Sequence, residues 1–423
     1  MLALRDTQLL MYTLIADFLH KKYRIDAHYF MRGGFWLSLG QVITLGFGLI
    51  STALFAHLLS AQDYGIYRYL IGLSAILASF SLTGLGQSIL QATTKNYSGF
   101  YKATLKVNFL YSLLITVAGV VMGGYYWFQG NTLLATGCFM VAIIQPLITV
   151  FQNTQSVIQG EGRYLESTKQ YAFRMAVVTF VSVASLLLTK NILILFFFYL
   201  SSLLLVNIIS HYSYRPSDSA LPKDVFVKYL SYAKHTSLRN MISNVAQKAD
   251  TLIVFTQLGA VELALYSIAT VIPEQVKGSF KNLAALLLPK YAKYEDSRKL
   301  LNSIPRRSLQ LFILLLSITC LYIVAAPFIY KILFPKYPDA AFFTQIMALS
   351  FPAMVSIIPV SALQSQMAKK KLYQVQILES VFLVFSTTIL TITIGVLGAI
   401  IAKVATRYAT LGYNFYLLYN DKD

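Results

Sequence analysis

The sequence has little charge and little cysteine. Of its 423 residues only 12% are charged, while 57% are hydrophobic and the mean hydropathy is +0.61. Soluble domains carry about a quarter charged residues, so this composition excludes a soluble globular protein and indicates a polytopic membrane protein. The two cysteines, Cys138 and Cys320, lie inside apolar runs, which excludes a disulfide framework and favours small buried hydrophobes.

Short catalytic motifs are also absent. The sequence contains no Gly-rich phosphate loop, no nucleophile elbow and no paired-histidine metal motif, and its five histidines are scattered. The loops expected on the outer side are very short, whereas a membrane polymerase or ligase would present a sizeable outer loop. We therefore expect a protein that is not an enzyme and that needs no metal or organic cofactor.

What the sequence does have is a series of long apolar runs. A helix needs about 20 apolar residues to cross a bilayer, and runs such as 192–209 are continuous rather than alternating, which excludes an outer-membrane barrel. The expected fold class is an all-α polytopic membrane protein with about 12 transmembrane helices. The predicted spans are residues 34–59, 66–92, 105–128, 132–158, 168–188, 191–212, 238–258, 265–288, 308–334, 340–367, 375–395 and 397–419.

Basic residues are distributed unevenly between the two sides of this topology. Lys and Arg total 35 against 17 Asp and Glu, a net charge of +18. With both termini inside, the cytoplasmic segments hold 24 basic residues, and the opposite side holds only Arg68, Lys190, Lys331 and Lys336. The positive-inside rule therefore predicts a cell (inner) membrane protein with cytoplasmic termini. A nucleic-acid partner is excluded because such a binder would not be this apolar, whereas membrane lipid is an expected partner.

The two halves of the chain resemble each other. The turn at 58–70 aligns with that at 257–269 at a shift of 199 residues, and each turn follows the first span of its half. Six spans per half give the halves the same orientation, as in two-lobed alternating-access transporters. The expected domains are a cytoplasmic leader at 1–32 that carries no cleavable signal peptide, a first six-helix bundle at 33–212, a cytoplasmic linker at 213–237, a second six-helix bundle at 238–419 and a cytoplasmic tail at 420–423.

Polar side chains recur inside the predicted spans, where they are costly unless they face a cavity or a partner. Asn240, Asn244 and Gln247 follow an i, i+4, i+7 spacing that places them on one helix face. Gln41 belongs to a milder polar stripe on the first span. These four residues are the predicted polar lining of a central, hydrated cavity between the two bundles.

Charged residues inside the spans are mostly basic. Seven cations face three acids, Asp250, Glu274 and Glu379, which leaves a formal +4. Such an excess would attract an anion, and a diphosphate or acidic sugar suits Lys and Arg donors. The candidate substrate-binding cations are Lys248, Lys277, Lys281, Arg239 and Arg174. The alternative for several of them is that they reach the interface or flank a span without a role in binding.

Three segments carry a family resemblance. They are GGFWLSLGQVITLGFGLISTALFAHLLSAQDYGIY (33–67), FPKYPDAAFFTQIMAL (334–349) and GVLGAIIAKVATRYATLGYNFYLLY (395–419). In order and spacing they resemble the polysaccharide-transporter, Wzx-type branch of the multidrug/oligosaccharidyl-lipid/polysaccharide flippase superfamily, over residues 31–419. The resemblance implies two six-helix bundles that form a V around a central cavity and move undecaprenyl-diphosphate-linked oligosaccharide, such as an O-antigen unit, across the inner membrane. It also implies energy from a proton or Na⁺ gradient.

The leading hypothesis is therefore a flippase for lipid-linked oligosaccharide that works by alternating access. Asp250 and Glu274 are the candidates for ion coupling, because a carboxylate near lysines can exchange a proton or Na⁺ as its environment changes. A polysaccharide polymerase and a chain-length regulator are candidate partners. The alternatives are a cation or drug antiporter of the same superfamily fold, and a membrane polysaccharide polymerase or ligase.

Overall fold

The computed structural model describes residues 27–214, 221–292, 297–366 and 368–420, and this described part is helical without strands. The first half contains α2 (Ala27–Leu58), α3 (Ala61–Ala78), α4 (Leu85–Thr94), α5 (Gly99–Phe128), α6 (Thr132–Phe151), α7 (Thr154–Gly160), α8 (Tyr164–Leu188) and α9 (Ile192–Tyr214). The second half contains α10 (Lys223–Leu258), α11 (Ala260–Ala292), α12 (Ser297–Leu333), α13 (Ala340–Ala348), the 3₁₀ helix η1 (Pro352–Ser356), α14 (Ile357–Ser365) and α15 (Lys369–Tyr419). The predicted all-α membrane fold is confirmed.

Three of the predicted spans are broken helices. The span at 66–92 is divided into α3 and α4, the span at 132–158 into α6 and α7, and the span at 340–367 into α13, η1 and α14. Between α3 and α4, the hydroxyls of Ser79 and Ser81 donate to the carbonyls of Ile76 and Ala78, which also accept i to i−3 bonds from the backbone N–H groups of the same serines. Hydropathy averaged over a whole span does not report such breaks, because the polar segments between the helices are short.

The last two predicted spans form the single element α15. Its backbone leaves helical geometry at Ile394 and at Gly395, where φ is +64°. Glycine adopts this left-handed conformation without a Cβ clash, and the kink turns the chain back so sharply that a Cβ on Gly398 would lie 1.8 Å from the carbonyl oxygen of Leu390. The kink lies where the sequence predicts the boundary between the spans at 375–395 and 397–419.

Several helices, α3 and α10 among them, begin earlier than the hydropathy predicts. Ser60 caps α3 by accepting from the backbone N–H of Asp63 at 3.1 Å, and its hydroxyl donates to the Asp63 carboxylate at 2.7 Å. The helix therefore begins at Ala61 rather than at residue 66. α10 begins at Lys223, directly after Pro222, so the expected linker at 213–237 is partly helical. Its 36 residues span about 54 Å, well beyond a hydrocarbon core of about 30 Å.

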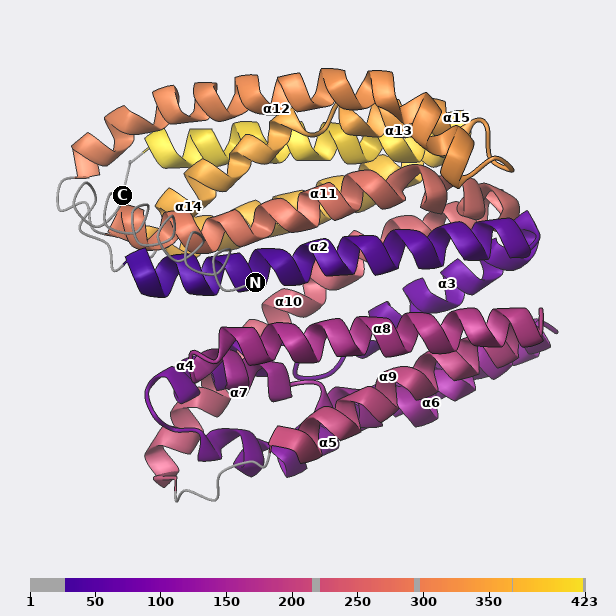
Figure 1. Ribbon diagram of the computed structural model, residues 1–423, viewed down its shortest axis with the longest axis horizontal. Helices are drawn as coiled ribbons and strands as arrows, with labels where there is room; N and C mark the ends of the chain where they lie inside the picture. Colours follow the sequence, from indigo (N-terminus) through magenta and orange to yellow (C-terminus); the bar gives the residue numbers. More distant parts are fainter. Residues whose placement is uncertain (1–26, 215–220, 293–296, 367, 421–423) are drawn as a thin grey trace, which may run out of the picture.

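Helices of the first half pack on one another, as do helices of the second half (Figure 1). α5 packs on α6 and α8 packs on α9, while α11, α13, α14 and α15 contact one another on the other side. α2 lies between α8 and α11, and α10 contacts both α3 and α15. The aligned turns that link α2 to α3 and α10 to α11 thus occupy equivalent places in the two halves. The domain boundaries themselves stay a prediction.

Hydropathy separates the helices that face lipid from those at the centre. Eight helices of the described part are long and apolar enough to cross a membrane, and α3, α10 and α11 are not among them. α12 is one of the eight, and its Leu321, Val324 and Phe328 are about 70% exposed, as suits side chains in contact with acyl chains. α3, α10 and α11 contact one another at the junction of the two halves.

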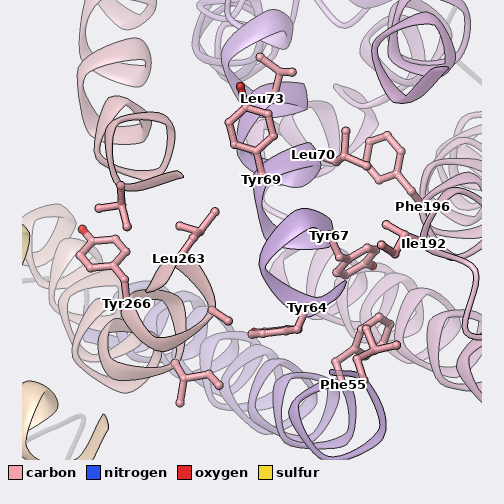
Figure 2. Packing of buried hydrophobic residues seen from close by; sticks show 14 of the residues in the cluster. Phe55, Tyr64, Tyr67, Tyr69, Leu70, Leu73, Ile192, Phe196, Leu263 and Tyr266 are labelled. Carbon is pink, nitrogen blue, oxygen red and sulfur yellow. The ribbon is translucent and has the colours of Figure 1, made fainter. Parts of the chain in front are cut away.

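The buried core crosses this junction. α3 contributes Tyr67 and Leu70 toward Phe196 on one side, and Tyr64 toward Leu263 on the other (Figure 2). Phe55 stacks on Tyr67 with ring centroids 4.8 Å apart. α3 is therefore buried from two directions, which explains why its residues do not show the one-sided pattern of a lipid-facing helix.

α3 approaches the second half so closely that only glycine fits. A Cβ on Gly65 would lie 1.8 Å from the carbonyl oxygen of Ala260, the first residue of α11. A Cβ on Gly72 would lie 2.8 Å from the methyl carbon of Thr251 on α10. These contacts fix the register of α3 against the two helices of the second half that carry most of the intramembrane charge.

We predict that Gly65→Ala lowers the free energy of unfolding by about 1 to 3 kcal/mol, because the added methyl group forces α3 and α11 apart. Gly124→Ala in α5 is the matched control, since a Cβ there meets nothing within 4 Å. Thermal unfolding of both variants in the same detergent measures the difference. Equal stability of the two variants would contradict the close contact between α3 and α11.

Candidate functional site: a charged cavity at the junction of the two halves

A cavity of about 490 Å³ lies at the junction, with walls from α2, α3, α8, α9, α10, α11 and α15. Its charged lining residues are Arg68, Lys248, Asp250, Glu274, Lys277, Glu379, Lys403 and Arg407. These described residues comprise five cations and three carboxylates, a formal charge of +2. The central cavity that the polar spans predict is therefore present, and its charged lining is cationic.

A second cavity of about 390 Å³ adjoins the first one within the second half. The two share Gln247, Lys277, Glu379 and Arg407 as lining residues. The second cavity adds Arg239, while much of its remaining wall is apolar and comes from η1, α14 and α15. The polar centre thus continues into a partly apolar space.

Lys403 on α15 joins two carboxylates from different helices. Its Nζ lies 2.6 Å from Oδ2 of Asp250 on α10 and 3.0 Å from Oε1 of Glu274 on α11. Arg407, one helical turn further along α15, places Nη2 2.7 Å from the same Glu274 oxygen. Both of these ion pairs join Glu274 on α11 to α15.

Hydroxyl groups complete the coordination of this network. Tyr266 donates its phenolic hydrogen to Oδ2 of Asp250 at 2.7 Å, and Oδ1 accepts from the backbone N–H and the hydroxyl of Thr251 at 2.6 and 3.1 Å. Arg407 also donates to the Ser350 hydroxyl at 2.6 Å. Asp250 is only 3% exposed, and a carboxylate buried this deeply requires such partners. We name the set Asp250, Glu274, Lys403 and Arg407 the four-charge network.

The structure brings five of the predicted site residues to the central cavity: Lys248, Asp250, Glu274, Lys277 and Gln247. Arg239 lines the adjoining cavity. Arg174 lines neither of them and borders a small separate cavity among α6 to α9. Lys281 belongs to α11, but its side chain lies outside the described residues.

The remaining predicted polar residues do not line either cavity within the described part of the chain. They are Gln41, Asn240 and Asn244. The side-chain amide of Gln41 instead lies 3.5 Å from a Cβ built on Gly278 of α11. The cavity face of α10 carries Lys248 and Asp250 beside Gln247, so it is rotated relative to the predicted amide stripe.

Sequence reasoning missed three cations of the site: Arg68, Lys403 and Arg407. Arg68 was expected on the outer side, at the start of the predicted span 66–92, but the Ser60 cap starts α3 at Ala61 and places Arg68 two turns inside the helix. That cap, with Asp63 three residues later, was the available signal. Lys403 and Arg407 share a face of the predicted span at 397–419, which contains no Asp or Glu, so any acidic partners must come from another helix.

Structural likeness defines the class of protein. The fold resembles a lipid II flippase, MurJ, in an inward closed conformation, with a TM-score of 0.68, 12% identity and coverage of 90% of this chain and 86% of that one. It also resembles an inward-facing multidrug resistance MATE family transporter of the MOP superfamily, with a TM-score of 0.63, 14% identity and coverage of 93% and 94%. The fold also resembles a MATE protein in complex with MaD5, with a TM-score of 0.63, 12% identity and coverage of 91% of this chain and 94% of that one. The fold is thus that of MOP superfamily membrane transporters.

The family follows from the sequence match. A family model described as "Polysaccharide biosynthesis protein" matches residues 54–336, about two thirds of the chain, and the protein belongs to this family. No curated protein matches the sequence. The family supports the expected polysaccharide-biosynthesis character of the protein, and the apolar helices and the fold support a multi-pass membrane protein.

We predict that Lys403→Met destabilises the protein by about 3 to 5 kcal/mol, because it leaves two carboxylates without their shared cation. Lys331→Met is the control, since Lys331 is exposed at the end of α12. Adding Asp250→Asn to Lys403→Met should recover part of the loss. Thermal unfolding in detergent tests this, and a double variant as unstable as the single one would contradict coupling between the two residues.

Proposed function

We propose that this protein is a flippase that moves a diphosphate-linked, lipid-anchored oligosaccharide across the inner membrane by alternating access. The observation that carries the proposal is the cationic cavity at the junction of the two halves, deep within apolar helices. A cation inside a membrane protein is costly unless an anionic partner neutralises its charge, so a surplus of cations favours an anionic cargo. Membership of a polysaccharide-biosynthesis family and likeness to a lipid II flippase support a lipid-linked saccharide.

In this mechanism the lipid tail stays in the bilayer while the diphosphate and sugars enter the cavity from the cytoplasmic side. Lys248 and Lys277 attract the diphosphate, with Arg239 in the adjoining cavity and Lys281 on α11 as further cations. Hydroxyl-bearing residues on the opposite wall, among them Tyr67 and Thr179, face the same space. Rocking of the two helix groups then exposes the cavity to the other side, with both termini remaining cytoplasmic.

Ion coupling is assigned to Asp250 and Glu274. Lys403 holds both carboxylates, so a proton or Na⁺ that neutralises either one weakens its bond to α15. Glu274 is the more accessible of the two, with 35% of its side chain exposed against 3% for Asp250. The exchange therefore begins at Glu274, and the ion gradient drives the loosening of the contact between α11 and α15.

A drug or cation antiporter shares the fold but fits the cavity less well. A cationic cargo requires surplus carboxylates, whereas the charged lining described here is cationic and its three acids lie beside five basic groups. A polysaccharide polymerase and a chain-length regulator are the partners expected of a flippase in surface glycan assembly.

We predict that Lys248→Gln combined with Lys277→Gln reduces export of the surface glycan at least tenfold, because two charge-assisted contacts are lost. Complementation of a flippase-deficient strain, at matched protein levels, measures export, and lipid-linked repeat units should accumulate on the cytoplasmic face. Lys190→Gln, an exposed residue before α9, is the control. Normal export by the double variant would contradict a role for the cationic cavity in transport. Resistance to cationic dyes without a glycan defect would favour the antiporter.

We predict separately that Glu274→Gln uncouples transport from the ion gradient. The variant should flip lipid-linked oligosaccharide in proteoliposomes at a rate that no longer responds to an imposed proton or Na⁺ gradient, because the exchanging carboxylate is gone. Glu166→Gln, at an exposed cytoplasmic ion pair with Arg163, is the control. An unchanged gradient response in Glu274→Gln would exclude this residue from coupling.

A further inference from the structure

Arg174 on α8 is a cation that no carboxylate of the first half neutralises. Residues 27–214 contain three acids: Asp63, Glu161 and Glu166. The Asp63 carboxylate accepts a hydrogen bond from Ser60 at the start of α3, and both glutamates form ion pairs with Arg163. Arg174 lies eight residues beyond Glu166, about 12 Å along the axis of α8, and has no ion pair or hydrogen bond in the part of the chain that the structure describes.

The charge of Arg174 is permanent and lies inside a helix that is apolar enough to cross a membrane. A guanidinium keeps its proton in proteins, so Arg174 cannot become neutral as a buried lysine or carboxylate can. Its Nε is buried without a hydrogen-bond partner. Such a charge is costly unless an anion or a polar cavity meets it. These observations point to an anionic ligand beside Arg174.

A small cavity with hydrogen-bond donors borders Arg174 at the break between α6 and α7. Gln170 lies one turn before Arg174 on the same face of α8, Gln152 follows the last residue of α6, and Ser210 belongs to α9. These three side chains make no hydrogen bond within the described residues. The lining that the structure describes contains amides and hydroxyls but no Asp or Glu. The cavity therefore offers donors from three helices and one positive charge without a counter-ion.

The volume of this cavity decides which anion it takes. The space measures about 20 Å³, and a single water needs about 10 to 15 Å³. One or two water-sized species therefore fit, whereas a phosphate, a diphosphate or a sugar is too large. Water alone would leave the charge of Arg174 without a counter-ion. A monatomic anion both supplies the charge and accepts hydrogen bonds from the guanidinium and the amides, and chloride is the abundant ion of this kind.

We propose that Arg174 and the three donors Gln152, Gln170 and Ser210 bind one chloride ion, which ties α8 and α9 to the break between α6 and α7. This cavity shares no lining residue with the central cavity, so the inference goes beyond the proposed function and does not depend on it. The ion has a structural task, because it neutralises a fixed charge within the first half. Since it binds the folded protein, stability rises with chloride concentration.

Thermal unfolding of the full chain in detergent tests the site, in sodium chloride and in sodium gluconate at the same concentration. We expect chloride to raise the unfolding temperature of the wild-type protein by roughly 2 to 5 °C relative to gluconate. In Arg174→Gln this difference should vanish. In gluconate the variant should be at least as stable as wild type, because it lacks a charge without a counter-ion, and in chloride it should be less stable. An arginine with only a packing role would lower stability in both salts.

Two further variants separate the site from other effects of salt. Lys248→Gln is the matched control, because it removes a cation from the central cavity and leaves the small cavity intact. It should keep the full chloride response. Gln170→Leu keeps the charge of Arg174 but removes one donor, so it should need about tenfold more chloride for the same rise in unfolding temperature.

Bromide is the probe that locates the ion, because its anomalous scattering identifies it in crystals of the wild-type protein. We expect a bromide peak in contact with the Arg174 guanidinium, and this measurement decides the question even where Arg174→Gln does not fold. Bromide found only in the central cavity overturns the site. A chloride response that survives in Arg174→Gln, or one that disappears in Lys248→Gln instead, overturns it as well.

Discussion

The structure depends on one buried interaction, the contact of Lys403 with Asp250 and Glu274. Three charges this close together in the middle of apolar helices are tolerated only because each one neutralises another. The contact joins α10, α11 and α15, and Arg407 extends it to Ser350 beyond α13. It therefore holds the second half together around the cavity.

The close approach of α3 to the second half sets the shape of the cavity. Gly65 and Gly72 let α3 lie directly on the backbone of α11 and on Thr251 of α10, so no bulky side chain separates the halves there. This brings Arg68 of the first half to the level of the charges of the second half. The cavity is consequently a shared property of both halves, and a change in their separation changes which cations face each other.

The helical fold could be predicted because membrane insertion imposes it locally. Long apolar runs such as 192–209 must be helical, since backbone groups in lipid have to be satisfied within the segment. The breaks after Ala78 and Phe151 were missed because hydropathy averaged over a whole span does not register polar segments as short as those at 79–84 and 152–156. The early start of α10 at Lys223 was missed because hydropathy reports the bilayer and not the part of a helix that projects from it.

The sequence by itself determined that this is a multi-pass helical membrane protein with basic residues inside it, because composition and apolar run length are local properties. It also determined that Lys248, Asp250, Glu274 and Lys277 belong to a polar interior, since their helices carry charges that lipid does not accept. Only the tertiary structure decided which charged residues form ion pairs with one another. Lys403 lies 153 residues from Asp250 in the chain, and nothing in periodicity links residues on separate helices. Packing alone therefore decided which charges cancel and which cations remain for an anion.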